Sequence, residues 1–254
     1  MLRDMFDLTG KVAMIAGGAG GIGSACAEAM AAFGAHVAIA DRNAERARAV
    51  ANGIKAAGGK ASSLALDITD YSEIEAATRL VIGRFGQIDI LLNNVGTTVR
   101  KPALETTTEE WTRVLTLNLT SAFFLSQVVG KEFIKNKRGK LIQIVSTGGL
   151  RASANFSAYG ASKAGLIHLV KTLALEWAPY QLNVNAIAPT ATDTDFTAEY
   201  YAQYPEKKAQ TIANHPFKRL GRPMDYAGAA VYLASSAADF VNGEVIVVDS
   251  GKTV

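Results

Sequence analysis

The sequence contains few residues of the kinds that build cross-linked or metal-stabilised proteins. Its single cysteine, Cys26, excludes an intrachain disulfide and a thiolate metal cluster, which fits a reducing compartment. The three histidines, His36, His168 and His215, lie far apart and have no spacing typical of zinc ligands. We therefore expect a cytoplasmic protein without a metal site.

Long apolar runs and a strong charge of either sign are also missing. No stretch approaches the roughly 20 apolar residues that are needed to span a bilayer. The charged residues Arg3, Asp4 and Asp7 interrupt the first residues before the apolar run of a signal peptide develops. The formal net charge is only +3, and the densest basic run, 131–138, falls at the expected end of a helix, where cations complement the helix dipole. We expect neither a membrane nor a nucleic acid as a partner.

What the sequence does have is a regular alternation of short apolar runs with helical patterns. The apolar runs are 11–16, 36–40, 61–66, 88–93, 140–145, 182–188 and 244–248. The helical patterns cover 21–34, 43–57, 70–84, 108–136, 157–178 and 223–235. Runs that are apolar throughout suit strands buried on both faces of a parallel sheet. We predict an α/β fold: one domain, 1–254, with a doubly wound sheet of about seven parallel strands and helices on both faces.

One segment, 190–222, breaks this alternation. It is long and polar, and it carries the aromatic residues Phe196, Tyr200, Tyr201 and Tyr204. Insertions of this size near the carboxyl ends of strands are often binding lids. The alternative is a pair of amphipathic helices whose aromatic residues simply pack on the domain. We favour a lid over a substrate.

A glycine-rich run, 16–23, joins the first predicted strand to the first predicted helix. Glycines at this place let the backbone approach a pyrophosphate, and the helix N-terminus offers unpaired N–H groups. The run fits two spacings, GxGxxG and GxxxGxG. The first uses Gly18, Gly20 and Gly23, and the second uses Gly17, Gly21 and Gly23. Both spacings indicate a dinucleotide site.

Polar residues at the ends of the next strands extend this site. Asp41 ends the second strand, where a carboxylate can accept hydrogen bonds from the adenosine ribose and repel a 2′-phosphate. Arg42 follows and could bind that phosphate, but we favour NAD over NADP. Asp67 ends the third strand, and the run 93–96 ends the fourth. Ligands bind at the carboxyl ends of strands in open α/β sheets.

Ser146, Tyr159 and Lys163 carry the chemistry. Tyr159 and Lys163 are four residues apart and so share one face of a helix. An ammonium beside a phenol favours the phenolate, so we expect a lowered pKa at Tyr159 and a role in proton transfer. Tyr204 and Lys208 have the same spacing, but no serine stands before them at the corresponding place.

Taken together, these motifs resemble the short-chain dehydrogenase/reductase family in its compact branch, over essentially the whole chain. The resemblance implies a Rossmann fold and the GxxxGxG register. It implies four active-site residues, which are Asn118, Ser146, Tyr159 and Lys163. The implied cofactor contacts are Gly17, Gly21, Ile22, Gly23, Asp41, Asp67, Ile68, Asn94, Gly96, Tyr159, Lys163, Pro189, Thr192 and Thr194.

The chain departs from the family pattern at a few positions. Ala16 replaces the usual threonine, Val95 an alanine, and Thr190 the glycine after Pro189. Gly20 stands where NADP-preferring relatives commonly carry a basic residue, which agrees with the preference for NAD.

By the same resemblance, a hydride passes between the nicotinamide and a substrate carbinol carbon. Tyr159 acts as general acid or base on the substrate oxygen, and Ser146 hydrogen-bonds the same oxygen. Lys163 also binds the nicotinamide ribose, and Asn118 holds a water that relays protons from Lys163. Relatives of this kind are mostly homotetramers, in which the helices at 108–136 and 157–178 pack against their symmetry mates.

The substrate is the least determined part. We expect its pocket to be formed by 97–104, 147–157 and 190–215. The polar residues on the first two segments are Arg100, Lys101, Arg151 and Asn155. Cations there can bind a carboxylate, which favours a sugar acid, polyol or keto-acid, although they also suit a surface or subunit interface. An apolar secondary alcohol is the alternative substrate. The competing functions are an NADPH-dependent ketone or 3-oxoacyl reductase and a non-catalytic NAD sensor or scaffold.

Overall fold

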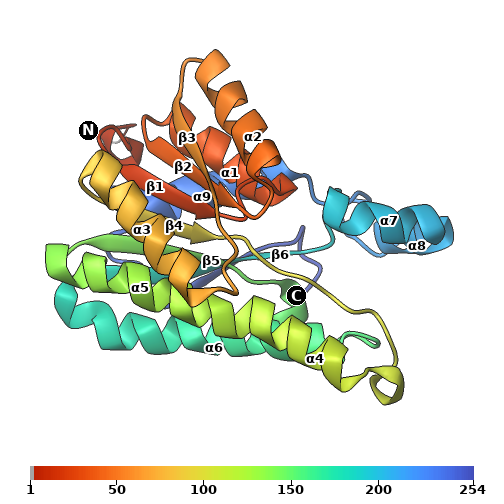
Figure 1. Cartoon of the computed structure of the whole chain (residues 1–254). Coiled ribbons are helices and arrows are strands. Elements are labelled where there is room, and N and C mark those ends of the chain that lie inside the picture. Colours follow the sequence, from red (N-terminus) through yellow and green to blue (C-terminus); the bar gives the residue numbers. More distant parts are fainter. Residues whose placement is uncertain (1–2) are drawn as a thin grey trace.

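The computed structural model describes residues 3–254, and its seven strands form one parallel sheet in the order β3-β2-β1-β4-β5-β6-β7 (Figure 1). The strands are β1 (Val12–Ala16), β2 (His36–Asp41), β3 (Lys60–Ala65), β4 (Ile90–Asn93), β5 (Gly139–Ile144), β6 (Leu182–Pro189) and β7 (Val245–Val248). The predicted fold class is confirmed, and every predicted strand is present with ends shifted by at most two residues. The strand order reverses between β1 and β4, which is where open α/β sheets bind their ligands.

The helices cover both faces of the sheet and create two apolar cores. They are α1 (Gly21–Ala32), α2 (Ala44–Ala56), α3 (Tyr71–Phe85), α4 (Thr108–Leu115), α5 (Ser121–Asn136), α6 (Ser157–Trp177), α7 (Asp195–Gln203), α8 (Pro205–Ala213) and α9 (Ala227–Ala234). Buried residues of α1, α2 and α9 pack on one face, and those of α3, α5 and α6 pack on the other (Figure 1).

The helix expected over 108–136 is not continuous. A π-helical turn, Thr116–Thr120, separates α4 from α5, and the N–H of Ser121 bonds to the carbonyl of Thr116. Such turns insert a residue into a helix and are frequent at functional sites. The side chain of Asn118, which belongs to this turn, is completely buried. The pattern 223–235 is likewise split, because a 3₁₀ turn, Pro223–Tyr226, precedes α9.

The segment 190–222 forms α7 and α8, which project beyond the carboxyl ends of the strands (Figure 1). His215, which is buried, holds the end of this segment against the rest of the domain. The His215 Nδ1 atom donates to the carbonyl of Thr211 (2.7 Å), and Nε2 accepts from the Thr190 hydroxyl (3.0 Å). Thr190, which replaces the glycine of the family pattern, therefore helps to hold this segment in place through its hydrogen bond to His215.

Among residues 3–254, no helix is long and apolar enough to cross a membrane. Within the same range, no three or more His, Cys, Asp or Glu side chains form a group that could hold a metal ion.

Candidate active site

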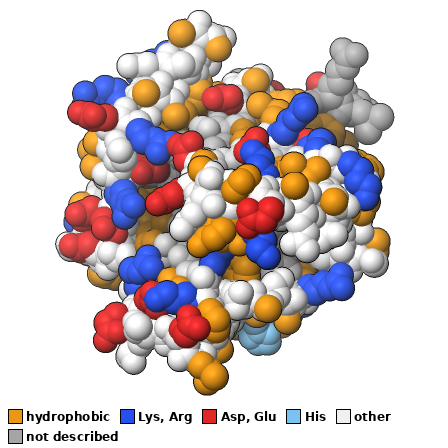
Figure 2. Space-filling view, turned by 90° about the vertical axis from the view of Figure 1, so that its right-hand side faces the viewer, with side chains coloured by type: hydrophobic (Ala, Val, Ile, Leu, Met, Phe, Trp, Pro, Cys, Tyr) orange, Lys and Arg blue, Asp and Glu red, His pale blue; other side chains and the backbone are white. Residues whose placement is uncertain are grey.

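A cavity of about 1270 Å³ runs along the carboxyl ends of the strands and under α7 and α8. It extends from the glycine loop and the end of β2, across β4 and β5, to the end of β6. The molecule carries interspersed basic, acidic and apolar side chains at this end (Figure 2). All the predicted cofactor contacts line the cavity except Gly23, and all the predicted active-site residues line it except Asn118.

The glycine loop has no room for side chains at the positions of the GxxxGxG register. Gly17 has a φ of +70°, and a Cβ at Gly21 would lie 2.7 Å from the Thr194 side chain. A Cβ at Gly23 would lie 2.3 Å from the Gly17 carbonyl oxygen. Asn94 Nδ2 donates to that same oxygen (3.0 Å), which ties the end of β4 to the loop. The bare loop and the first turn of α1 fit a dinucleotide pyrophosphate.

Asp41 lies at the end of the cavity that is expected to hold the adenosine, called the adenosine end below. Its carboxylate accepts hydrogen bonds from the N–H groups of Ala19 (3.2 Å) and Asn43 (3.0 Å), which hold it at the edge of the glycine loop. Arg42 is exposed and also lines the cavity. Asp67 lies two residues beyond the end of β3 and lines the cavity with Ile68. The adenosine end thus presents both a fixed carboxylate and a neighbouring guanidinium.

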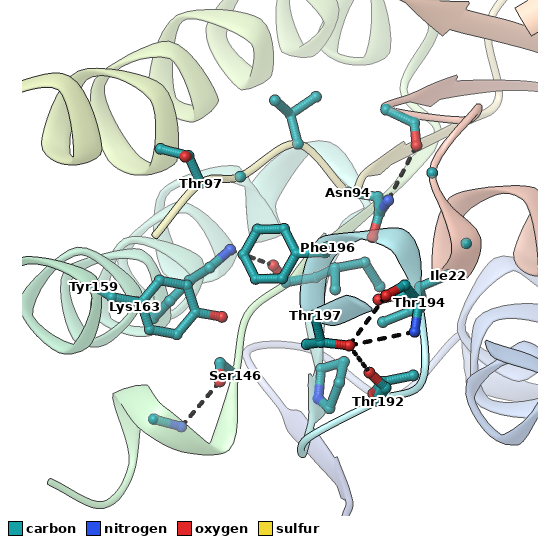
Figure 3. A pocket seen from close by; sticks show the side chains of 18 of the residues that line it. Ile22, Asn94, Thr97, Ser146, Tyr159, Lys163, Thr192, Thr194, Phe196 and Thr197 are labelled. Atoms are coloured by element: carbon teal, nitrogen blue, oxygen red, sulfur yellow. Dashed lines mark hydrogen bonds between the residues drawn. The ribbon is translucent and has the colours of Figure 1, made fainter. Parts of the chain in front are cut away.

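Ser146, Tyr159 and Lys163 meet over the end of β5, and their polar atoms face the same part of the cavity (Figure 3). Ser146 follows β5, and its hydroxyl accepts a hydrogen bond from the N–H of Gly148 (3.0 Å). Tyr159 and Lys163 lie on α6. The Lys163 ammonium is buried and donates to the carbonyl of Ile144 (2.9 Å).

The pKa values correct one prediction. Burial raises the pKa of the Tyr159 phenol above its ordinary value, whereas the Ser146 hydroxyl and the Arg100 guanidinium act in the opposite direction. Burial also lowers the pKa of Lys163 to about 8. The expected fall at Tyr159 is therefore wrong for this structure, because the low-dielectric surroundings disfavour both charged forms.

Asn118 lies behind the cavity. Its side-chain oxygen accepts from the N–H of Thr97 (2.7 Å), and its amide donates to the Thr97 carbonyl and to the Ser162 hydroxyl (both 2.9 Å). The side chain therefore pins the segment after β4 to α6. The expected water relay through Asn118 stays a prediction, and it would have to use the backbone or rearrange this side chain.

At the end of the cavity that is expected to hold the substrate, called the substrate end below, aromatic rings surround Arg100. The guanidinium carbon of Arg100 lies 3.9 Å from the centre of the Tyr200 ring, 5.0 Å from that of Phe156 and 5.9 Å from that of Tyr201. Tyr200 and Tyr201 belong to α7. Arg100 thus connects the segment after β4 to the projecting helices.

The other polar residues expected in this pocket do not line it. Lys101 pairs with Glu110 at 2.6 Å, because α4 begins beside it. The backbone of Asn155 turns through a φ of +67°, and its carbonyl accepts from the N–H of Lys101. Arg151 is exposed and donates to the carbonyl of Lys252 (3.4 Å). Of the four, only Arg100 lines the cavity.

Arg113 and Lys252 also line the cavity, although they lie outside the segments predicted to form the pocket. Phe156 lines it too and lies within the predicted segment 147–157. Phe156 stands three residues before Tyr159, so helical spacing could have singled it out. Arg113 belongs to α4 and reaches the hydroxyl of Thr97 (3.3 Å). Nothing in the sequence around Lys252 indicates its position.

Comparison with known proteins gives matches along nearly the whole chain. The family model described as enoyl-(acyl carrier protein) reductase matches residues 17–253. The 2-dehydro-3-deoxy-D-gluconate 5-dehydrogenase of Dickeya dadantii (strain 3937) is 37% identical over 252 residues, which cover 99% of this chain and 98% of that protein. The sorbitol dehydrogenase of Cereibacter sphaeroides is 40% identical over 254 residues, which cover 96% and 98%.

A solved structure is similar over the same length. It is a gluconate 5-dehydrogenase from Burkholderia cenocepacia J2315 in complex with NADP and tartrate. Its TM-score is 0.94 at 32% sequence identity, and the match covers 100% of this chain and 99% of that one.

Proposed function

The chain belongs to the short-chain dehydrogenase/reductase family, and from that premise we propose that its substrate is a sugar acid or related hydroxy acid and its cofactor NAD. Membership makes the chain an NAD(P)-dependent oxidoreductase that interconverts CH–OH and C=O groups. The observation that carries the choice of substrate is Arg100, a cation in the cavity with no carboxylate partner within 4.0 Å among residues 3–254.

Tyr159 and Ser146 handle the proton at the substrate oxygen. Tyr159 is the acid/base: its phenolate takes the proton of the substrate hydroxyl during oxidation, and its phenol returns a proton during reduction. The Ser146 hydroxyl donates a hydrogen bond to the same oxygen and stabilises the negative charge that develops there. The bound nicotinamide supplies the acceptor or donor of the hydride.

Lys163 and Asn118 support that proton transfer. Lys163 in its charged form favours the Tyr159 phenolate, and the Ile144 carbonyl holds the ammonium in place. Asn118 fixes Thr97 and Ser162 around it, so the wall of the site keeps its shape. We also propose that a water held at Asn118 relays protons from Lys163.

The preference for NAD rests on the adenosine end. The Asp41 carboxylate is held in place by two backbone N–H groups and would repel a 2′-phosphate. Gly20 offers no cation to offset that repulsion. The second candidate is an NADPH-dependent ketone reductase, which Arg42 favours because its guanidinium lies beside the same position. The related gluconate 5-dehydrogenase from Burkholderia cenocepacia binds NADP.

The substrate end accommodates a hydroxy acid. Arg100 can grip a carboxylate through two hydrogen bonds while its planar face stays stacked on Tyr200. The same stacking couples the anion to α7, so we propose that 190–222 closes over the substrate as a lid. The relatives named for 2-dehydro-3-deoxy-D-gluconate and gluconate support this class of substrate.

We also propose a cytoplasmic homotetramer. Leu119, Phe123, Phe124 and Leu169 line an apolar groove between α5 and α6, and both phenylalanines are more than one third exposed. A second copy that packs on this face would cover them. Light scattering on the purified protein checks the assembly, and a monomer at micromolar concentration would contradict it.

The decisive experiment pairs cofactor binding with a substrate panel. Fluorescence titrations with NADH and NADPH at physiological salt should show NADH binding at least about tenfold more tightly, equal to about 1.4 kcal/mol. With NAD, gluconate should be oxidised faster than sorbitol or cyclohexanol, and R100M should raise the KM for gluconate and leave that for sorbitol within twofold. Preferred NADPH binding would support the second candidate. Binding of either cofactor without turnover of any alcohol would support a sensor or scaffold.

A further inference from the structure

The chain after β7 forms a tight turn that the carboxylate of Asp249 organises. Asp249 is 7% exposed and accepts hydrogen bonds from the N–H groups of Gly251 and Thr253 (both 2.8 Å) and from the Thr253 hydroxyl (2.7 Å). Ser250 and Gly251 both have positive φ, +60° and +84°. These bonds give the last residues of the described chain a defined conformation.

The turn brings Lys252 into the wall of the active-site cavity, where its side chain is half-buried. Burial lowers the pKa of Lys252, and the nearby positive charge of Arg151 acts in the same direction. The negative charge of Asp249 acts in the opposite direction. Arg151 donates to the Lys252 carbonyl, so the two cations are neighbours. Among residues 3–254 neither makes an ion pair with a carboxylate within 4.0 Å. An ammonium that lines the cavity and makes no such ion pair suits an anion.

In the strand order, the segments that carry Lys252 and Arg100 begin on opposite sides of β5, and both residues line the cavity. Ser146 follows β5, which lies between β4 and β6. Arg100 follows β4, on one side of β5, whereas Lys252 follows β7, beyond β6 on the other side. A molecule whose carbinol lies at Ser146 and Tyr159 can therefore meet one cation at each end.

We propose that Lys252 binds a second anionic group of the substrate, so that the enzyme prefers polyhydroxy acids with an acidic group at each end. This inference rests on the proposed function, which assigns the first acidic group to Arg100. The second group is a carboxylate, as in an aldaric acid, or a phosphate, as in a phosphorylated aldonic acid. Both present oxygen anions to the same ammonium.

Calorimetric binding to the NADH-saturated enzyme tests the inference without relying on turnover. The ligands are gluconate, glucarate and 6-phosphogluconate, which share a carbon-chain length and differ in the second acidic group. The variants are K252Q, K252R and, as a matched control, K171Q, which removes an exposed lysine on α6 that makes no ion pair within residues 3–254.

We expect the wild type to bind glucarate or 6-phosphogluconate at least about tenfold more tightly than gluconate, in line with one charged hydrogen bond. K252Q should lose the tighter binding of glucarate or 6-phosphogluconate and still bind gluconate within twofold of wild type. K252R should keep most of the difference in affinity between the ligands, and K171Q should keep all of it. The ligand that gains most identifies the second group. Equal affinities in the wild type, or an advantage that survives in K252Q, would overturn the inference.

The two proposals fail differently. In one outcome, R100M impairs the turnover of gluconate, whereas K252Q changes the binding of no ligand. This outcome would support the proposed function and exclude the role of Lys252. Turnover of sorbitol alone, with no binding of any of the three acids, would overturn both.

Discussion

The Lys163 ammonium donates a hydrogen bond of 2.9 Å to the backbone carbonyl of Ile144. This bond joins α6, which carries Tyr159, to the last residue of β5, two residues before Ser146. Lys163 therefore holds Tyr159 and Ser146, the two residues proposed to contact the substrate oxygen, at a fixed separation. Lys163 is only 4% exposed, and burial lowers its pKa to about 8.

The first prediction concerns stability against pH. Between about pH 8 and about pH 10.4, the unfolded chain keeps the Lys163 proton that the folded protein has released, so folding gains stability as the pH rises. The gain is at most about 1.4 kcal/mol per pH unit. Urea unfolding of wild type and K163M should therefore diverge in favour of wild type from pH 7.5 to 9.5. A constant difference between the two proteins would contradict the lowered pKa.

The second prediction concerns Tyr159. Y159F keeps the ring and removes the hydroxyl, so turnover should fall by about 10³-fold, within the range for a lost acid/base group. NADH affinity should stay within a few-fold, since the substitution leaves the glycine loop and Asp41 untouched. The matched control is Y204F, because Tyr204 and Lys208 share the same spacing in the segment 190–222 and Tyr204 does not line the cavity. Activity of a few per cent or more in Y159F would exclude the acid/base role.

The third prediction concerns the adenosine end. D41N removes the negative charge and keeps an oxygen that can accept from Ala19 or Asn43. The ratio of NADPH to NADH affinity should rise by at least about tenfold, equal to about 1.4 kcal/mol. R42Q should change the ratio in the opposite direction or leave it unchanged. An unaltered ratio in D41N would show that Asp41 does not select the cofactor.

The sequence predicts the sheet well because its strands are short runs rich in apolar residues, and helical patterns separate them. Residues that follow strands, among them Asp41 and Ser146, are then placed at one edge of the sheet by topology alone. The spacing of Tyr159 and Lys163 needs only the geometry of one helix.

What the sequence could not predict depends on packing between distant segments. The π-helical turn around Asn118 arises where α4 meets α5 and α6, and the local sequence has no signal for it. The pKa of Tyr159 is raised by burial, which outweighs the opposite effects of the Ser146 hydroxyl and the Arg100 guanidinium. Arg100 and Lys101 are adjacent and both basic, yet only one lines the cavity, because Glu110 holds the other.

The last prediction separates two glycines of the loop. Helix propensity alone predicts that G23A stabilises the protein by about 1 kcal/mol, since Gly23 lies inside α1. The structure predicts the reverse, because the added Cβ would lie 2.3 Å from the Gly17 carbonyl oxygen and 2.9 Å from Asn94 Nδ2. The loop must move, and the tie between Gly17 and Asn94 breaks with it.

G20A is the matched control for that substitution. The nearest atoms to a Cβ at Gly20 are Asn94 Nδ2 at 3.3 Å and the Gly17 oxygen at 3.4 Å, which small shifts can accommodate. Titration with NADH should show an affinity reduced at least about tenfold in G23A and within about threefold of wild type in G20A. The melting temperature should fall in G23A as well, because the contact is with backbone. Equal affinities in the two variants would mean that the loop adapts freely, and the GxxxGxG register would then lose its physical basis.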